Sequence, residues 1–290
     1  MSYKIEKDLL VDDGKDTSGK RVEHHDTRKK SGKLKQIKYL VIHYTASDSF
    51  KGDIATLSTS KREASCHLVL SPEGQFAQIG NFKDCLWHAG KSAYKGLSGL
   101  NRYSIGIEVT CPGPVKLIRS PELAYKFWNG KVVKATESPY NFVEASHKNG
   151  GGIGWWAGFT DAQNEALIEV GSLIMKHYKI EEAVGHDMIA PGRKIDPGPC
   201  LPDRVYAALN GRKEDHYEEE EDLKPLEERI IMTVSNVAPD YLNFRNAPGG
   251  DKIGSLREGT PVELLEKRGT WFKVKTPAGY IGFVSGYYLK

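Results

Sequence analysis

A run of charged residues divides this 290-residue chain into two unlike parts. Residues 213–229 read KEDHYEEEEDLKPLEER, and the stretch Glu218–Asp222 within them is uninterrupted acid. Like charges at such close spacing resist compaction, so the segment is typical of an acidic linker. We therefore expect two domains, one on each side of it, which agrees with a length about twice that of a typical ~150-residue domain.

The part before the linker mixes strand and helix patterns. Short β-prone segments bounded by Gly, Pro, Ser or Asn predict strands at 39–43, 66–70, 75–80 and 104–110. Residues 160–178 carry apolar side chains at three- and four-residue spacing, which predicts a helix that begins at a capping box of Thr160 and Gln163. A second helix is expected between Pro202 and Gly211. This part is thus of the α/β class.

The two ends of the chain differ from this central part. Residues 230–290 contain only short β-prone segments separated by turns rich in Gly, Pro and Asn, which predicts a small β-barrel. Residues 1–33 are polar and run into the basic stretch 28–38, so we interpret them as a solvated polar leader.

Composition and charge exclude several classes of function. With 41 Lys and Arg against 38 Asp and Glu, the net charge of +3 is too small to indicate nucleic-acid binding. No run of ~18 apolar residues predicts membrane insertion, and the amino terminus shows no signal peptide, so we expect synthesis in the cytoplasm. The four cysteines are too sparse for a disulfide scaffold. We expect a monomer.

Two distant segments hold the strongest chemical signal. The first, VIHYTAS, ends a predicted strand in His43, and the second, GHDMIAPGRKIDPGP, contains His186 and Asp196. A histidine at a strand end is, by itself, more often structural than a ligand. Two histidines with one carboxylate, however, form a known catalytic zinc set that leaves the fourth position open for water.

Five ordered blocks extend this signal over residues 34–212. They read IHYTAS, SCHLVLSPEGQFAQI, WHAGKS, NRYSIGIEV and GHDMIAPGRKIDPGP. Together they resemble the zinc-dependent N-acetylmuramoyl-L-alanine amidases, the type shared by phage lysozyme-amidases, cell-wall recycling amidases and peptidoglycan recognition proteins. The resemblance implies a mixed central sheet flanked by helices, and a Zn²⁺ site in a groove that takes the glycan-peptide junction of bacterial peptidoglycan.

The resemblance also assigns roles to single residues. It implies that Zn²⁺ is held by His43, His186 and Asp196, that Glu108 moves the proton of the attacking water, and that Lys194 stabilises the oxyanion. Without it, Glu108 would be interpreted as a surface carboxylate and Lys194 as a solvated cation. Cys200 follows Asp196 closely and could offer a thiolate, but the register after Lys194 favours Asp196.

Other residues fall in the blocks that line the implied groove. We expect substrate contacts from Trp87, His88, Ala89 and Asn101, with a core position as the alternative for Trp87. Some family members carry a catalytic tyrosine where this chain has Cys66, so Glu108 is expected to carry more of the proton transfer. His67 is either a structural ring or part of the site.

The segment between residues 112 and 159 contains HKNGGGIGWWAGF. Adjacent Trp155 and Trp156 cannot both face inward on a strand, and a Gly-rich approach suits a mobile loop. The two rings could therefore form a lid that stacks on sugar rings, or the loop could pack against the domain.

The C-terminal barrel, residues 230–290, resembles a bacterial SH3-type domain in its LNFRNAP turn and its final GYIGFVSGYYL. In wall hydrolases such modules bind peptidoglycan, although a spacer role is the alternative. The whole chain is thus expected to cut the amide between N-acetylmuramic acid and L-alanine, as a phage or prophage lysin or a delivered effector. The alternatives are a non-catalytic recognition protein and a zinc endopeptidase that cuts the stem peptide.

Overall fold

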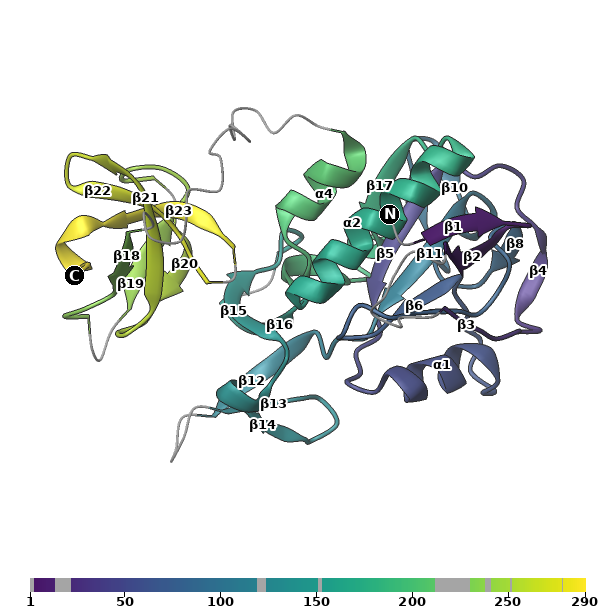
Figure 1. The fold of residues 1–290 in the computed structure, drawn as a ribbon, viewed down its shortest axis with the longest axis horizontal. Coiled ribbons are helices and arrows are strands. Elements are labelled where there is room, and N and C mark those ends of the chain that lie inside the picture. Colours follow the sequence, from purple (N-terminus) through teal and green to yellow (C-terminus); the bar gives the residue numbers. More distant parts are fainter. Residues whose placement is uncertain are drawn as a thin grey trace.

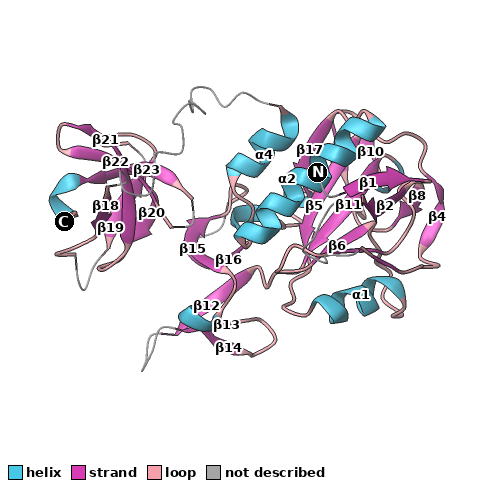
Figure 2. Ribbon diagram, in the orientation of Figure 1, coloured by secondary structure: helices cyan, strands magenta, loops and turns pink. Residues whose placement is uncertain are grey.

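The computed structural model describes residues 3–13, 22–118, 124–150, 153–211, 230–237, 241–250, 252–277 and 279–290. The predicted acidic linker, 213–229, lies outside these ranges. Figures 1 and 2 show an α/β part and a separate C-terminal group of strands, with a third, smaller sheet between them. None of the described helices is long and apolar enough to span a membrane.

A six-stranded mixed sheet forms the centre of the α/β part, in the order β17-β5-β11-β6-β7-β3. Strands β17, β5, β11 and β6 are parallel, and β7 runs antiparallel to β6. The sequence predicted four of these strands within a few residues of their observed bounds. Those bounds are β3 Glu23–His24, β5 Tyr39–Tyr44, β6 Leu68–Leu70, β7 Phe76–Gln78, β11 Ser104–Val109 and β17 Glu182–Gly185.

Helices cover both faces of this sheet (Figure 1). Side chains alternate between the faces of a strand, so Leu40 and Ile42 of β5 pack with the helices α2 (Asp161–Tyr178) and α4 (Asp203–Asn210). The opposite face packs against α1 (Phe50–Ser58) and the short α3 (His186–Ile189). Both predicted helices are present, and the predicted capping box at the start of α2 is confirmed.

The interpretation of residues 1–33 as a solvated leader is wrong for residues 3–12, whereas most side chains of residues 23–33 are exposed. Residues Tyr3–Glu6 and Leu9–Asp12 pair as a hairpin, β1 and β2, which packs in the core cluster that contains α2. Leu10 is fully buried. Because alternate side chains of a strand lie on the same face, a few apolar residues among charged ones are enough to form one face that packs in the core.

Strand β4 (Lys30–Lys33) also belongs to the fold, because it pairs with β8 (Asp84–Leu86). Its two lysines bind the buried carboxylate of Asp84 at 3.0 and 2.6 Å. Two further short strands, β9 (Ala93–Tyr94) and β10 (Leu97–Ser98), form a small hairpin before β11.

The segment between β11 and α2 forms its own antiparallel sheet rather than a loop, in the order β14-β13-β12-β16-β15. We call it the insertion sheet. Trp155 and Trp156 lie on β16, which favours packing over a mobile lid as the role of this segment. The strand alternates them: Trp156 is buried, whereas Trp155 is half-buried beside Tyr125. The strands are β12 Pro114–Ile118, β13 Ala124–Lys126, β14 Val132–Lys134, β15 Asn141–Ser146 and β16 Ile153–Gly158.

The C-terminal region is all-β, as predicted, with six strands in the order β18-β21-β22-β23-β19-β20. Its hydrophobic core includes Val234, Val262, Val274 and Val284. It contacts the α/β part, because the Arg257 guanidinium lies 4.9 Å from the ring of Trp155. The strands are β18 Ile231–Thr233, β19 Leu242–Arg245, β20 Lys252–Leu256, β21 Pro261–Arg268, β22 Trp271–Lys275 and β23 Ile281–Ser285.

We predict that Leu10→Ala lowers the free energy of unfolding by about 2–5 kcal/mol, because it leaves a cavity at a fully buried leucine. Denaturant unfolding measures this loss. Leu9→Ala is the matched control, since it deletes the same atoms from a partly exposed neighbour, and it should cost less than half as much. Equal and small effects would show that the hairpin does not pack.

Candidate metal centre

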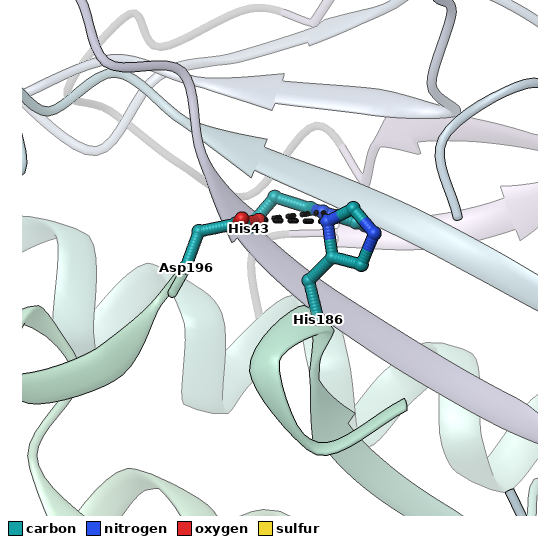
Figure 3. Close-up of side chains that lie close together, drawn as sticks. All are labelled: His43, His186 and Asp196. Carbon is teal, nitrogen blue, oxygen red and sulfur yellow. Dashed lines mark hydrogen bonds and ion pairs between the residues drawn. The ribbon is translucent and has the colours of Figure 1, made fainter. Parts of the chain in front are cut away.

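Three of the predicted residues meet at one edge of the central sheet. His43 lies near the carboxyl end of β5, and His186 directly follows the adjacent parallel strand β17. The carboxyl ends of parallel strands meet at the same edge, where α/β proteins commonly bind their ligands. Asp196 lies in the loop after α3, and Figure 3 shows its carboxylate oxygens facing both imidazole rings.

One atom from each residue points at the other two. The two Nδ1 atoms of His43 and His186 lie 2.9 Å apart, and Asp196 Oδ2 lies 3.0 Å from the first and 2.9 Å from the second. The three residues are 1%, 2% and 7% exposed. Among the described residues, these three form the group that could hold a metal ion.

The partners of His186 determine which of its nitrogens carries the proton. Its Nε2 lies 3.1 Å from the carbonyl oxygen of Ala89, which can only accept. Arg193 Nη2 is 3.3 Å from the same nitrogen, but it donates to the carbonyl oxygens of Ala89 and Lys91, so its two hydrogens are already used. His186 therefore donates from Nε2 and directs the Nδ1 lone pair at the site.

A longer chain of contacts gives the same result for His43. The Nε2 of His88 lies 3.3 Å from the Ser104 carbonyl oxygen, so it donates and leaves His88 Nδ1 as an acceptor. His43 Nε2, 3.1 Å away, donates to that acceptor. The Nδ1 lone pair of His43 therefore also faces the site.

Two imidazole lone pairs and a carboxylate oxygen thus converge, and three acceptors this close repel one another unless a cation or a proton lies among them. Burial, followed by the nearby His186, lowers the pKa of His43 to about 4, which keeps its imidazole neutral at pH 7. Neutral imidazole and carboxylate are the ligands that Zn²⁺ prefers. The donor set therefore fits a zinc ion.

Glu108 and Lys194 both lie near this group, because Lys194 interacts electrostatically with His43, and Glu108 with Asp196. Glu108 of β11 pairs in register with His43 of β5, so the two side chains leave the same face of the sheet. The pKa of Glu108 lies well above its usual range, mainly because the side chain is buried and secondly because Asp196 is near. The positive charge of Lys194 offsets only part of this rise. Within the described structure, Glu108 Oε2 is buried without a hydrogen-bond partner.

The residues predicted to line the groove are placed differently. His88 is 7% exposed and lies behind His43, and Ala89 is fully buried with its N–H donating to Asn101 Oδ1 at 2.6 Å. His88 and Ala89 therefore lie behind the metal ligands, and the half-buried Asn101 holds Ala89. Trp87 is half-buried, and its indole N–H donates to Ser31 Oγ at 2.7 Å.

The predicted substrate contacts of Trp155 and Trp156 do not fit their surroundings. Trp156 is 6% exposed, and its indole N–H donates to the carbonyl oxygen of Ala145 within the insertion sheet. Trp155 lies under Arg257 of the C-terminal region. Of the two alternatives, packing of the segment describes these rings.

Two other open questions have structural answers. His67 accepts from Gly106 N–H and donates to the Asp84 carbonyl oxygen, both at 3.0 Å, which supports the structural interpretation of this ring. Cys200 is fully buried, and burial followed by a hydrogen bond with Cys111 raises the pKa of its thiol, so it is a poor thiolate ligand. All four cysteines lie in described segments and are free thiols.

The sequence analysis missed one part of the site, the buried carboxylate of Asp187. It follows His186 directly and is fully buried. Three consecutive residues in the turn after β15 contact Asp187: His147 Nε2 and Lys148 Nζ each lie 3.1 Å from its Oδ2, and the Asn149 side chain donates to its backbone carbonyl oxygen at 2.9 Å. The insertion therefore fixes the backbone beside the second ligand. The sequence shows the basic residues of the HKN segment, 147–149, but nothing in it indicates that they contact Asp187.

This fold and site define a mixed α/β domain with a candidate His-His-Asp metal centre, joined to a small β domain. Residues 33–199, more than half of the chain, match the family model described as N-acetylmuramoyl-L-alanine amidase. Residues 240–290 match the family model described as Bacterial SH3 domain. The chain belongs to the N-acetylmuramoyl-L-alanine amidase family.

Individual relatives agree with this membership. The chain is 34% identical over 186 residues to N-acetylmuramoyl-L-alanine amidase AmiD of Escherichia coli (strain K12), a match that covers 61% of this chain and 55% of AmiD. It is 29% identical over 214 residues to 1,6-anhydro-N-acetylmuramyl-L-alanine amidase AmpD of Haemophilus influenzae, which covers 67% and 90%. The chain thus spans about half the length of AmiD.

Solved structures with similarity to the chain include an AmpD derivative and AmiD from E. coli in complex with a substrate. The AmpD structure aligns with a TM-score of 0.46 at 21% identity, covering 69% of this chain and 99% of AmpD. The AmiD complex aligns with a TM-score of 0.43 at 27% identity, covering 71% and 65%.

We predict that Asp196→Ala lowers bound zinc at least ~10-fold, because it removes one of three converging acceptors. Cys200→Ser should leave the zinc content unchanged, since this thiol lies outside the group. Metal analysis of the two purified variants gives the answer. Zinc lost from Cys200→Ser but kept in Asp196→Ala would contradict the assignment.

Proposed function

We propose that this chain is a zinc-dependent peptidoglycan amidase that hydrolyses the bond between the lactyl group of N-acetylmuramic acid and L-alanine of the stem peptide. Family membership supports the amidase class, and the names of AmiD and AmpD both specify an N-acetylmuramyl-L-alanine amide bond. The observation that carries the proposal is the register pairing of Glu108 with His43, because a carboxyl group that leaves the sheet beside a candidate metal ligand suits proton transfer.

Each side chain of the site has a definite task in this reaction. Bound zinc would supply a water of lowered pKa and polarise the amide carbonyl. Glu108 would orient that water, take its proton and pass it to the departing amine of L-alanine, a role that suits its desolvated Oε2, which has no partner among the described residues. Lys194 stabilises the negative charge that develops on the carbonyl oxygen.

Two alternatives use the same fold. A non-catalytic recognition protein would not need the proton-transferring carboxylate, yet Glu108, Lys194 and Asp196 are all present and lie close enough to influence one another electrostatically. A zinc endopeptidase would use the same groups on a peptide bond within the stem. The bond that is cut separates these cases.

The decisive experiment is mass spectrometry of purified peptidoglycan digested with the whole protein. The proposed function requires free stem peptides that begin with L-alanine and glycan strands that have lost their peptides. Stem fragments that begin at an internal residue would identify an endopeptidase. Undigested walls that bind the protein would identify a recognition protein.

We also propose that the C-terminal region binds the wall. Its match to the bacterial SH3 description supports this role, because a second contact with the polymer raises the local concentration of the enzyme. A wall-binding barrel suits an enzyme that acts on intact wall more than one that processes soluble fragments. We therefore favour action on the cell wall after release or delivery, as in a phage or prophage lysin or an effector.

We predict that Glu108→Gln lowers kcat on muropeptides by about 10²–10⁴-fold, the usual contribution of general acid-base catalysis. The amide keeps the shape of the side chain but cannot take a proton. Zinc content should stay unchanged, because Glu108 is outside the ligand group. The control is Glu165→Gln, an exposed glutamate of α2, which should retain full activity.

A variant that ends at Arg212 should still cleave small soluble muropeptides, because every proposed catalytic residue precedes that point. Its binding to intact sacculi should fall in a sedimentation assay. Circular dichroism must show that the shortened protein is folded, since Trp155 loses the cover of Arg257. Undiminished sedimentation would leave the barrel as a spacer.

A further inference from the structure

The Nε2 atoms of both candidate histidine ligands, which face away from the metal site, contact two consecutive residues. His43 Nε2 donates to His88 Nδ1, and His186 Nε2 donates to the carbonyl oxygen of the next residue, Ala89. One short segment therefore contacts both rings from behind, through the side chain of His88 and the backbone carbonyl of Ala89. The sequence analysis had placed this segment in the substrate groove.

This segment is itself held at both residues. The N–H of Ala89 donates to Asn101 Oδ1, and His88 Nε2 contacts both the carbonyl and the hydroxyl oxygen of Ser104. Ser104 begins β11, the strand that carries Glu108. The support of the metal ligands and the position of the proton-transferring carboxylate thus depend on the same strand.

Packing leaves the His88 ring little freedom. A Cβ atom added to Gly106 of β11 would lie 2.5 Å from the Cγ and Nδ1 atoms of His88, closer than real Cβ contacts come. The ring therefore lies directly against the backbone at Gly106. This contact gives a physical reason for glycine in the SIGIE strand.

We propose that His88 is a positioning residue for zinc, a role that rests on the proposed zinc-dependent function. By accepting the Nε2 proton of His43, it holds the tautomer and orientation that direct the Nδ1 lone pair at the ion. The Ala89 carbonyl does the same for His186. Such partners of metal-bound histidines typically change metal affinity 10–100-fold when they are removed.

His67 provides a matched control within the same molecule. Its ring lies 5.7 Å from that of His88, is fully buried, and is bonded at both nitrogens to backbone groups. Among its described partners there is no candidate metal ligand. Loss of this ring therefore removes packing and two hydrogen bonds, neither of which goes to a candidate metal ligand or to His88.

The experiment measures Zn²⁺ affinity of the full chain by competition with a chromogenic chelator, and records the absorption spectrum of the Co²⁺-loaded protein. His88→Leu removes the acceptor, His88→Asn keeps an acceptor oxygen near the Nδ1 position, and His67→Leu is the control. We expect His88→Leu to weaken zinc binding about 10–100-fold and to alter the Co²⁺ spectrum. His88→Asn should recover most of the affinity, and His67→Leu should keep it while it lowers Tm.

Parental zinc affinity in His88→Leu would overturn the inference, and so would equal losses in His88→Leu and His67→Leu. If His88→Leu does not fold, the result for His88→Asn decides. A folded His88→Asn protein that has lost zinc affinity would overturn the inference, because this variant still offers an acceptor to His43. A parent protein that binds no Zn²⁺ would overturn the proposed function as well. A parent that binds zinc and releases stem peptides, with unaffected His88 variants, would overturn only the positioning role.

Discussion

The convergence of three hydrogen-bond acceptors in a buried place is the constraint on which the rest of the site depends. Such an arrangement is unfavourable without a cation, and burial increases the electrostatic repulsion because the local dielectric is low. It persists only if each imidazole is prevented from rotating or changing tautomer. Three distant parts of the sequence meet that requirement: His43 on β5, residues 88–89 behind it, and the segment from His186 to Asp196 after β17.

The loop that carries Asp196 has little regular structure of its own, so its position comes from its neighbours. The insertion holds the helix before it, α3, through contacts of His147 and Lys148 with the Asp187 carboxylate. Near its end, the Tyr280 hydroxyl of the C-terminal region donates to the Pro199 carbonyl oxygen at 3.1 Å. The third ligand is therefore placed by contacts from both sides, and neither belongs to the central sheet.

Local patterns predicted the elements that local physics determines. The strand that ends at His43 and the capping box of Thr160 were visible in the sequence because β-propensity and helix capping act over a few residues. Motif resemblance, by contrast, brought His43, His186 and Asp196 together. The resemblance did not indicate that the WHAG block lies behind the His43 ring, on the side away from the metal site. For this reason His88 was predicted to line the groove. The burial of Leu10 was equally invisible, because it depends on a distant helix.

The insertion sheet connects the two domains physically, which changes how the C-terminal region is to be understood. A flexibly attached module raises local concentration but leaves orientation free. Here Arg257 packs between the rings of Trp155 and Tyr241, at 4.9 and 5.4 Å. The same insertion reaches Asp187 through His147, where strand β15 has just ended. A wall polymer bound at the barrel would thus be held in a set orientation to the metal loop, with the insertion sheet as the element that sets it.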